Sequence, residues 1–276
     1  MRAVSVVARR RLPPRALGVA LLSGLLFFRA PAAAEDAALE TDLESVLDED
    51  RRILGSDPSE IVSRLEVRNE FLHVDGGHSD ATIFRGDWAP THWLLGRVEI
   101  PLVAADFEES GSDFGLGDVL VGVRGKAMLA EHWSLIGEMA AFLDTATSEP
   151  VGTGSNVLAP QTVLVWKPSP PWILGLQVQW FGSVGGGSES ETIREWAIRP
   201  QALWHLPRGF WLLADPRIYL DRVDGTCAAF FPTAEFGKIL TRHVEVWVRG
   251  GGNAAGGGRE ERSGWVTEAG VRYLFD

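Results

Sequence analysis

From residue 61 onward one short pattern recurs about a dozen times: apolar and polar residues alternate over roughly ten positions, and a turn follows. In the last repeat Trp265, Val271 and Tyr273 fall on one face of an extended chain. Glu268 and Arg272 fall on the other face. Because successive side chains of a strand point to opposite faces, each run has an apolar face and a charged face. This repetition predicts a closed antiparallel sheet whose apolar side meets lipid.

The first 34 residues have the order of an export signal. Five arginines precede an uncharged apolar run at 16–28, and Ala32, Ala33 and Ala34 then form a small-residue cleavage site. This order predicts a secretory signal peptide over 1–34. The alternative, an N-terminal membrane anchor, needs about 20 apolar residues, and the run is shorter than that.

Removal of the signal leaves a strongly acidic chain. The whole chain has 26 basic and 37 acidic residues, and residues 1–34 carry six arginines and no acid, so 20 basic and 37 acidic residues remain, a net charge of −17. Such a charge argues against nucleic acid as a partner, because phosphate is met by basic patches. With Cys227 as its one cysteine, the chain forms no internal disulfide, and it shows no Cys/His spacing of a metal site.

Residues 35–60 differ from the rest of the mature chain. They contain ten acids and two bases, and apolar residues recur at helical spacing between Leu39 and Leu54. Thr41 and Glu44 have the spacing of a capping box. We interpret 35–60 as an acidic N-terminal segment, either a short helix that plugs the barrel mouth or a flexible leader.

Residues 61–276 are predicted to form an outer-membrane β-barrel of about 12 strands with up-and-down topology. The second strand has the weakest pattern, but an even number of strands is needed to bring both ends of the barrel to the periplasmic side. The predicted strands are 61–74, 80–88, 91–103, 118–129, 132–144, 156–166, 172–182, 191–204, 210–221, 226–236, 243–249 and 264–275.

The connections alternate between short turns and longer loops, as they do in bacterial barrels. Short turns are predicted at 89–90, 130–131, 167–171, 205–209 and 237–242, and long loops at 104–117, 145–155, 183–190 and 250–263. Seven tryptophans flank the short turns and three lie near the opposite strand ends, which predicts two interfacial girdles. They are Trp88, Trp93, Trp133, Trp166, Trp172, Trp204 and Trp211 at the first level, and Trp180, Trp196 and Trp265 at the second.

The charged faces are predicted to line the interior of the barrel. Twelve strands enclose a narrow lumen, because eight are filled by side chains and sixteen leave an aqueous channel. Unpaired charges near a constriction would favour a selective pore, whereas matched Arg and Glu would favour a closed structural interior. The predicted lumen-lining residues are Arg64, Glu66, Arg68, Glu70, Arg97, Glu99, Arg124, Lys126, Glu138, Glu195, Arg199, Asp215, Arg217, Glu235, Glu245, Arg249, Glu268 and Arg272.

Three segments resemble a known family. They are LLGRVEIPLV at 94–103, GLGD at 115–118 and AAFLDTATSEPVGTGSNVLAPQTVLVW at 140–166. The likeness covers most of 61–276 and is similar to bacterial outer-membrane barrels named for a MetA pathway of phenol degradation. It implies a transporter that admits small, often aromatic or hydrophobic, compounds. The last strand also resembles an outer-membrane assembly signal, although Asp276 follows the terminal Phe275.

An enzyme is the rival class, because outer-membrane phospholipases also have twelve strands. The six histidines are scattered among strand ends and turns, and none stands two residues before a Ser-Asn-Gly as in those enzymes. We therefore expect no catalytic residue. Asp106, Glu108, Glu109, Asp113 and Asp118 are interpreted as a solvated acidic loop, since their spacing matches no calcium loop.

Taken together, the sequence predicts a monomeric barrel that is exported to the bacterial outer membrane and is not an enzyme. Its expected partners are outer-membrane lipid, the barrel-assembly machinery and a small permeant. No cofactor or metal is expected. The alternative from another class is a non-conducting barrel with a structural or surface-interaction role.

Overall fold

The computed structural model describes residues 55–74, 76–108, 111–185, 193–221, 227–256 and 264–275. The predicted signal peptide and residues 35–54 of the acidic segment lie outside this part of the chain. None of the described residues belongs to a helix that is long and apolar enough to cross a membrane.

Most of the described chain is β-strand. Its 17 strand segments belong to a single sheet. The segments are β1 (Arg64–Val74), β2 (Gly77–Thr91), β3 (Leu94–Phe107), β4 (Gly111–Leu116), β5 (Val119–Ala130), β6 (Trp133–Leu143), β7 (Val157–Leu158), β8 (Gln161–Ser169), β9 (Trp172–Ser183), β10 (Arg194–His205), β11 (Phe210–Ala214), β12 (Arg217–Asp221), β13 (Cys227–Phe231), β14 (Thr233–Ile239), β15 (Val244–Gly252), β16 (Ala255–Gly256) and β17 (Trp265–Leu274). Short 3-10 turns occupy η1 (Glu149–Val151) and η2 (Pro207–Gly209).

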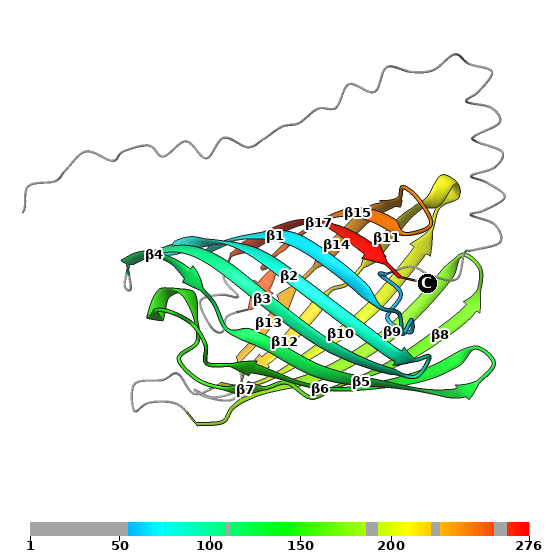
Figure 1. Ribbon diagram of the computed structural model, residues 1–276, viewed down its shortest axis with the longest axis horizontal. Helices are drawn as coiled ribbons and strands as arrows, with labels where there is room; N and C mark the ends of the chain where they lie inside the picture. Colours follow the sequence, from blue (N-terminus) through cyan, green and yellow to red (C-terminus); the bar gives the residue numbers. More distant parts are fainter. Residues whose placement is uncertain are drawn as a thin grey trace, which may run out of the picture. The chain divides into compact units, whose positions relative to one another are not determined.

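The sheet closes on itself as an up-and-down barrel. Five pairs of consecutive segments (β4/β5, β7/β8, β11/β12, β13/β14 and β15/β16) each form one interrupted strand, which leaves twelve strands. Each strand pairs antiparallel with its neighbours in sequence, and β17 pairs with β1, from Arg64 opposite Leu274 to His73 opposite Trp265. The all-β, twelve-stranded class is therefore confirmed. Figure 1 shows the strands arranged as a barrel.

The length of the second strand was underestimated from the sequence. The sequence predicted a weak strand at 80–88, but β2 has 15 residues and pairs with β1 from Gly77 to Asp87. Its outward positions include Gly86 and Thr82, so its apolar face is less marked than in the other strands. Pairing with two strong neighbours overrides this weak local signal.

Two predicted long loops are partly strand. The predicted loop 104–117 contains the end of β3 and all of β4, which pair with each other from Leu102 opposite Leu116 to Phe107 opposite Gly111. The glycine-rich loop 250–263 likewise begins inside β15. Glycine and acidic side chains disfavour strands locally, but continued hairpin pairing stabilises them here.

Three prolines lie within the predicted strands, and each of them forfeits one ladder hydrogen bond, which favours a local bulge. Pro200 stays in register opposite Leu176. Pro216 separates β11 from β12 without a register change toward β10, because Ala202 faces Ala214 and Ile198 faces Ile218. Beside Pro232 the bulge is present: Thr233 faces Gly251 but Ala229 faces Gly256, so β15/β16 contains one extra residue.

The tryptophan girdles are formed with one exception. Trp133 stacks on Trp166 at 5.4 Å between ring centroids, and Trp172 stacks on Trp204 at 5.3 Å, both next to short turns. Trp211 was predicted in the same girdle, but it is fully buried and faces the interior. It shares the inward parity of Leu213 and Asp215, so the neighbouring Phe210 takes the outward position.

The outward face carries an apolar belt. Large apolar side chains there are exposed although they lie in the middle of strands; Val67, for example, is 47% exposed. In a soluble protein such a surface would be exceptional, because contiguous apolar patches are normally small. Outward apolar residues include Leu65, Val67, Val98, Ile100, Leu102, Val121, Val123, Leu176, Phe236, Val248 and Val271.

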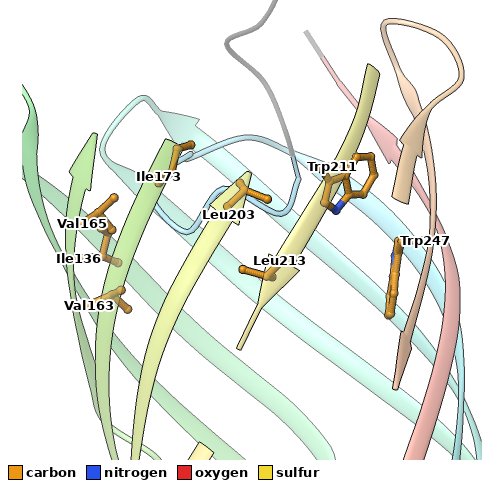
Figure 2. Packing of buried hydrophobic residues seen from close by; sticks show 8 residues of the cluster. All are labelled: Ile136, Val163, Val165, Ile173, Leu203, Trp211, Leu213 and Trp247. Carbon is orange, nitrogen blue, oxygen red and sulfur yellow. The ribbon is translucent and has the colours of Figure 1, made fainter. Parts of the chain in front are cut away.

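An apolar cluster lies inside the barrel toward the short-turn end, where the first and last strands begin and end. Figure 2 shows its side chains on β6, β8, β9, β10, β11 and β15 pointing into the interior. The members are Ile136, Val163, Val165, Ile173, Leu203, Trp211, Leu213 and Trp247. Three of its members, Val163, Leu213 and Trp247, also border the cavity described below.

Arginine at Val67 is expected to destabilise the barrel by about 2–4 kcal/mol, the cost of a basic side chain facing lipid near the midplane. The same change at Leu129, which is exposed beside a short turn, should cost about 0–1 kcal/mol because the side chain reaches the interface. Urea unfolding in lipid vesicles measures the free energy of unfolding of both variants. Equal costs at the two positions would contradict a membrane-spanning apolar belt.

Candidate functional site

The charged inward faces of the strands enclose one cavity of about 570 Å³. On β1, for example, Arg64, Glu66 and Arg68 alternate with the outward Leu65 and Val67. Fifteen of the predicted lumen-lining residues border this cavity: Arg64, Glu66, Arg68, Glu70, Arg97, Glu99, Arg124, Glu138, Arg199, Asp215, Arg217, Glu235, Arg249, Glu268 and Arg272. That they border the path of a permeant stays a prediction.

Three predicted lining residues do not border the cavity. Lys126 is half-buried on β5 toward the short-turn end, and Glu195 is buried on β10. Glu245 is buried on β15, where its carboxylate accepts hydrogen bonds from the backbone N–H of Gly55 at 3.1 and 3.2 Å. Their inward parity was predicted from the strand period, but their height along the barrel was not.

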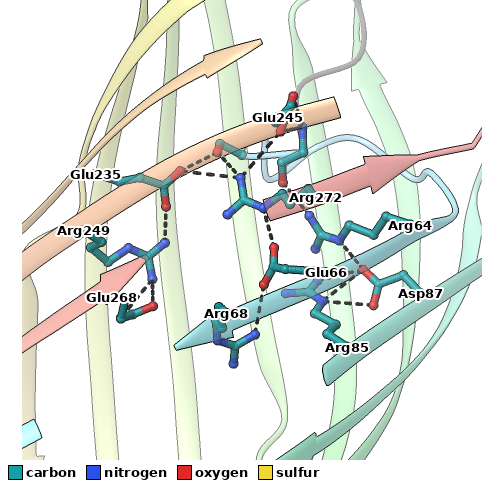
Figure 3. Close-up of polar contacts among 12 residues, drawn as sticks. Arg64, Glu66, Arg68, Arg85, Asp87, Glu235, Glu245, Arg249, Glu268 and Arg272 are labelled. Carbon is teal, nitrogen blue, oxygen red and sulfur yellow. Dashed lines mark hydrogen bonds and ion pairs between the residues drawn. The ribbon is translucent and has the colours of Figure 1, made fainter. Parts of the chain in front are cut away.

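Arg272 is the centre of one charged network (Figure 3). Its guanidinium donates to the carboxylate of Glu66 and lies 3.5 Å from Glu235 and 3.7 Å from Glu245. It also donates to the Ser56 hydroxyl at 2.5 Å. Three carboxylates from three strands therefore share this one buried cation, and burying them requires such compensation.

Asp87 is the centre of a second network. Its carboxylate accepts from Arg64 at 2.6 Å, from Arg85 at 2.7 Å and from Arg97 at 3.1 Å. Arg97 continues the network to Glu138 at 2.8 Å, and Arg124 meets the same carboxylate at 2.6 Å. Arg85 and Asp87 were missed by the sequence reasoning, although the alternation through the weak second strand would have placed them inward.

Amide side chains form a different wall on β8, β9 and β10. The Gln177 amide donates to Gln161 at 2.6 Å and to Gln179 at 3.2 Å, and Gln161 donates to Glu138 at 2.6 Å. Gln201 donates to Asp215 at 3.2 Å. These glutamines were not predicted as lining residues because the sequence argument considered charged residues alone.

An apolar wall completes the cavity toward the long-loop end. It consists of Ile83, Pro101, Val103, Leu120 and Phe142, which border the cavity from β2, β3, β5 and β6. Ile83 is opposite Pro101 and Leu120 is opposite Phe142, so these side chains are cross-strand neighbours. Moving toward the short turns, the same strands present Arg85, Glu99, Arg124 and Glu138.

All nine arginines that border the cavity have a carboxylate partner within 4.0 Å. The weakest contact is that of Arg217, whose Nη2 lies 3.9 Å from Asp215. Arg199 donates to the same carboxylate, and Arg249 bridges Glu235 at 2.6 Å and Glu268 at 3.3 Å. By the criterion set from the sequence, this matching is the pattern of a closed structural interior, although the cavity remains open between the pairs. The nine are Arg64, Arg68, Arg85, Arg97, Arg124, Arg199, Arg217, Arg249 and Arg272.

Residues 55–60 cross the interior at the short-turn end. At one side Arg64 donates to the Gly55 carbonyl at 2.6 Å, and Ser56 donates to Glu235 at 2.5 Å. At the other side Lys167 on β8 pairs with Asp57 at 2.7 Å and with Glu60 at 3.1 Å. Because β8 belongs to the wall opposite β14, β15 and β17, the segment is fastened to both walls. Ser59 is fully buried there.

The predicted acidic loop and the histidines have different surroundings. Asp118 borders the cavity on the inner face, so its assignment to a solvated loop was wrong, whereas Asp106 and Asp113 are exposed. His73 and His78 join an aromatic cluster with Phe71 and Trp265. Within the described residues, no group of three or more His, Cys, Asp or Glu side chains is placed to hold a metal ion.

No protein-family model matches the chain, and no curated protein matches its sequence. Solved structures share its fold. An outer-membrane channel of Pseudomonas putida F1, described as COG4313, matches with a TM-score of 0.66 and 13% identity over 81% of this chain and 99% of that channel. The NanC porin matches at 0.58 and 13% identity, covering 76% and 100% of the two chains. The KdgM porin matches at 0.53 and 10% identity, covering 77% and 99%. At these identities the likeness shows the barrel fold.

Replacing Arg272 with Gln is expected to destabilise the folded barrel by about 3–5 kcal/mol, because Glu66, Glu235 and Glu245 lose their shared cation. The matched control is Arg194→Gln on an exposed position of β10. The midpoint of the heat-dependent gel shift and urea unfolding measure the difference in stability between the two variants. An Arg272 variant as stable as the control would show that the network does not stabilise the barrel.

Proposed function

We propose that this protein is a non-enzymatic bacterial outer-membrane channel for small molecules. The observation that carries the proposal is the cavity of about 570 Å³ inside a closed barrel whose outer surface is apolar. A barrel of twelve strands is wide enough to leave such a space between its side chains. The fold shared with a channel and two porins supports the same function.

The orientation follows from the position of the barrel ends. Arg64 and Leu274 are cross-strand partners at the short-turn end, which in bacterial barrels faces the periplasm. The long connections then face outward. In this proposal residues 1–34 export the chain, the barrel-assembly machinery inserts residues 61–276, and the barrel works as a monomer in outer-membrane lipid.

Residues 55–60 narrow the periplasmic mouth in this proposal. Their contacts with Glu235 and Glu245 at one wall and with Lys167 at the other hold them across the lumen. None of these contacts belongs to the strand ladder, so the segment can be displaced without breaking the sheet. These contacts support a plug to which the described part of the acidic segment contributes.

The apolar wall bears on the permeant. A solute that passes beside Ile83, Val103 and Phe142 gains from an apolar portion, and the charged groups deeper in the lumen favour a polar one. We therefore propose small permeants that combine both, including aromatic compounds. The resemblance to the MetA-pathway barrels is consistent with this class.

A non-conducting structural barrel is the second candidate. The matching of each cavity arginine with a carboxylate favours it, because paired charges satisfy an interior that does not have to bind or pass solutes. The two candidates differ in ion flow, which a single measurement decides.

Single-channel recording of the exported full chain in planar lipid is expected to show discrete, salt-dependent current steps. The heat-dependent gel shift confirms that the recorded protein is folded. Benzoate should reduce the open current more than ribose at equal concentration, because only benzoate carries an apolar ring for the apolar wall. A folded barrel without current would overturn the channel and support the structural candidate.

Lys167→Ala is expected to raise the mean conductance, because residues 55–60 lose both contacts with the β8 wall. The control is Lys238→Ala on the outward face of β14, where the ammonium lies 4.6 Å from the Phe210 ring centroid. Single-channel recording compares the two variants with the unchanged chain. Identical conductance in all three would contradict a plug formed by 55–60.

A further inference from the structure

The connection between β6 and β7, residues 144–156, folds onto the inner wall of the barrel. Its 3-10 turn η1 packs against β3 and β4, although the next strands along the chain are β6 and β7. To reach β3 the loop must cross the strand formed by β4 and β5. It crosses where this strand is interrupted, at Gly117 and Asp118. Val151 at the end of the turn is buried.

Asp118 fastens the loop at this crossing. Its carboxylate accepts hydrogen bonds from the Thr153 backbone N–H and hydroxyl, both at 2.8 Å, and from the Ala146 N–H at 3.3 Å. Both arms of the loop are thus held by one side chain. A carboxylate that accepts several hydrogen bonds holds its donors more strongly than a neutral acceptor does, because charge-assisted hydrogen bonds are stronger than neutral ones.

The GLGD sequence at 115–118 also gives the loop space. A side chain at Gly117 would lie 3.0 Å from the Val151 carbonyl, 3.0 Å from Val103 and 3.1 Å from Pro101. Backbone bonds join the two segments as well, since the Thr147 N–H donates to the Leu116 carbonyl at 2.9 Å. Glycine permits the close approach, and the aspartate that follows provides the anchor.

The loop lies over the apolar wall of the cavity. Pro101 and Val103, which meet the loop at Gly117, both border the cavity, and so does Asp118 itself. Because the loop packs on this wall near the long-loop end, it lies beside the outer part of the lumen. A solute entering from outside would pass this loop before it reaches the charged networks.

We propose that Asp118 is a positioning residue that holds residues 144–156 as a fixed inner loop, and that this loop sets the size of solute admitted at the outer end of the lumen. The second part rests on the proposed channel function. The first part is a structural statement that stands without ion flow. The experiment therefore has one readout for each part.

The loop position is tested by cysteine labelling in chains that carry Cys227→Ser and Val151→Cys. A membrane-impermeant maleimide added to intact cells is expected to react at least tenfold faster when Asp118→Ala is also present, because buried Val151 is then released. Asp106→Ala, a change at an exposed position of β3, should leave the rate unchanged. Glu149→Cys, on the exposed side of the loop, reports equal access of the reagent in all chains.

The pore size is tested by single-channel recording and by uptake of uncharged polyethylene glycols of increasing length. Asp118→Ala is expected to raise the conductance and to admit longer polymers, whereas Asp106→Ala should match the unchanged barrel. Equal labelling of Val151→Cys in both backgrounds would overturn the anchoring. Faster labelling with an unchanged polymer limit would overturn the role in size selection. No current from any folded chain, together with faster labelling, would instead overturn the proposed channel and support the anchoring.

Discussion

The obligation to pair every backbone N–H and C=O in lipid governs this structure. Hydrocarbon offers no hydrogen-bond partner, so a sheet that spans it must have no free edge. Here the first and last strands meet that requirement by pairing over ten residues, from Arg64 opposite Leu274 to His73 opposite Trp265. Once the ring is closed, the strand period of two decides for every residue whether it faces lipid or the interior.

Closure also explains the charged interior. Basic and acidic side chains on the inward parity have no route to bulk water through the wall, so they must find partners among themselves. The Arg272 guanidinium is one cation that several carboxylates share. The Asp87 carboxylate is one anion that several guanidinium groups share. Residues 55–60 enter the same networks, so the N-terminal segment is bound by groups that the barrel already needs to neutralise.

The sequence was sufficient to predict the direction of a side chain where the strand period of two alone decides it. Glu268, Arg272 and the outward Val271 follow directly from alternation. The number of strands follows from alternation together with the even count that such a barrel requires. Trp211 was predicted in a girdle because it lies beside a short turn, although it shares the parity of Asp215, a predicted lumen residue, and alternation would have placed it inward. The sequence was insufficient where contacts are non-local. The fastening of 55–60 to Lys167 joins segments more than a hundred residues apart, beyond any local pattern.

The GLGD sequence shows how one interruption of a strand can be put to use. A break at Gly117 and Asp118 costs ladder hydrogen bonds, but it also frees backbone groups that the loop 144–156 then pairs with, such as the Leu116 carbonyl. Because Asp118 keeps the inward parity, its carboxylate is presented to that loop rather than to lipid. In both of our proposals an end of the lumen is therefore narrowed by the same physical means. At each end a segment that lacks a place in the ladder is held by charged groups whose inward direction the closed sheet imposes, Asp118 at one end and Lys167 with Glu245 at the other.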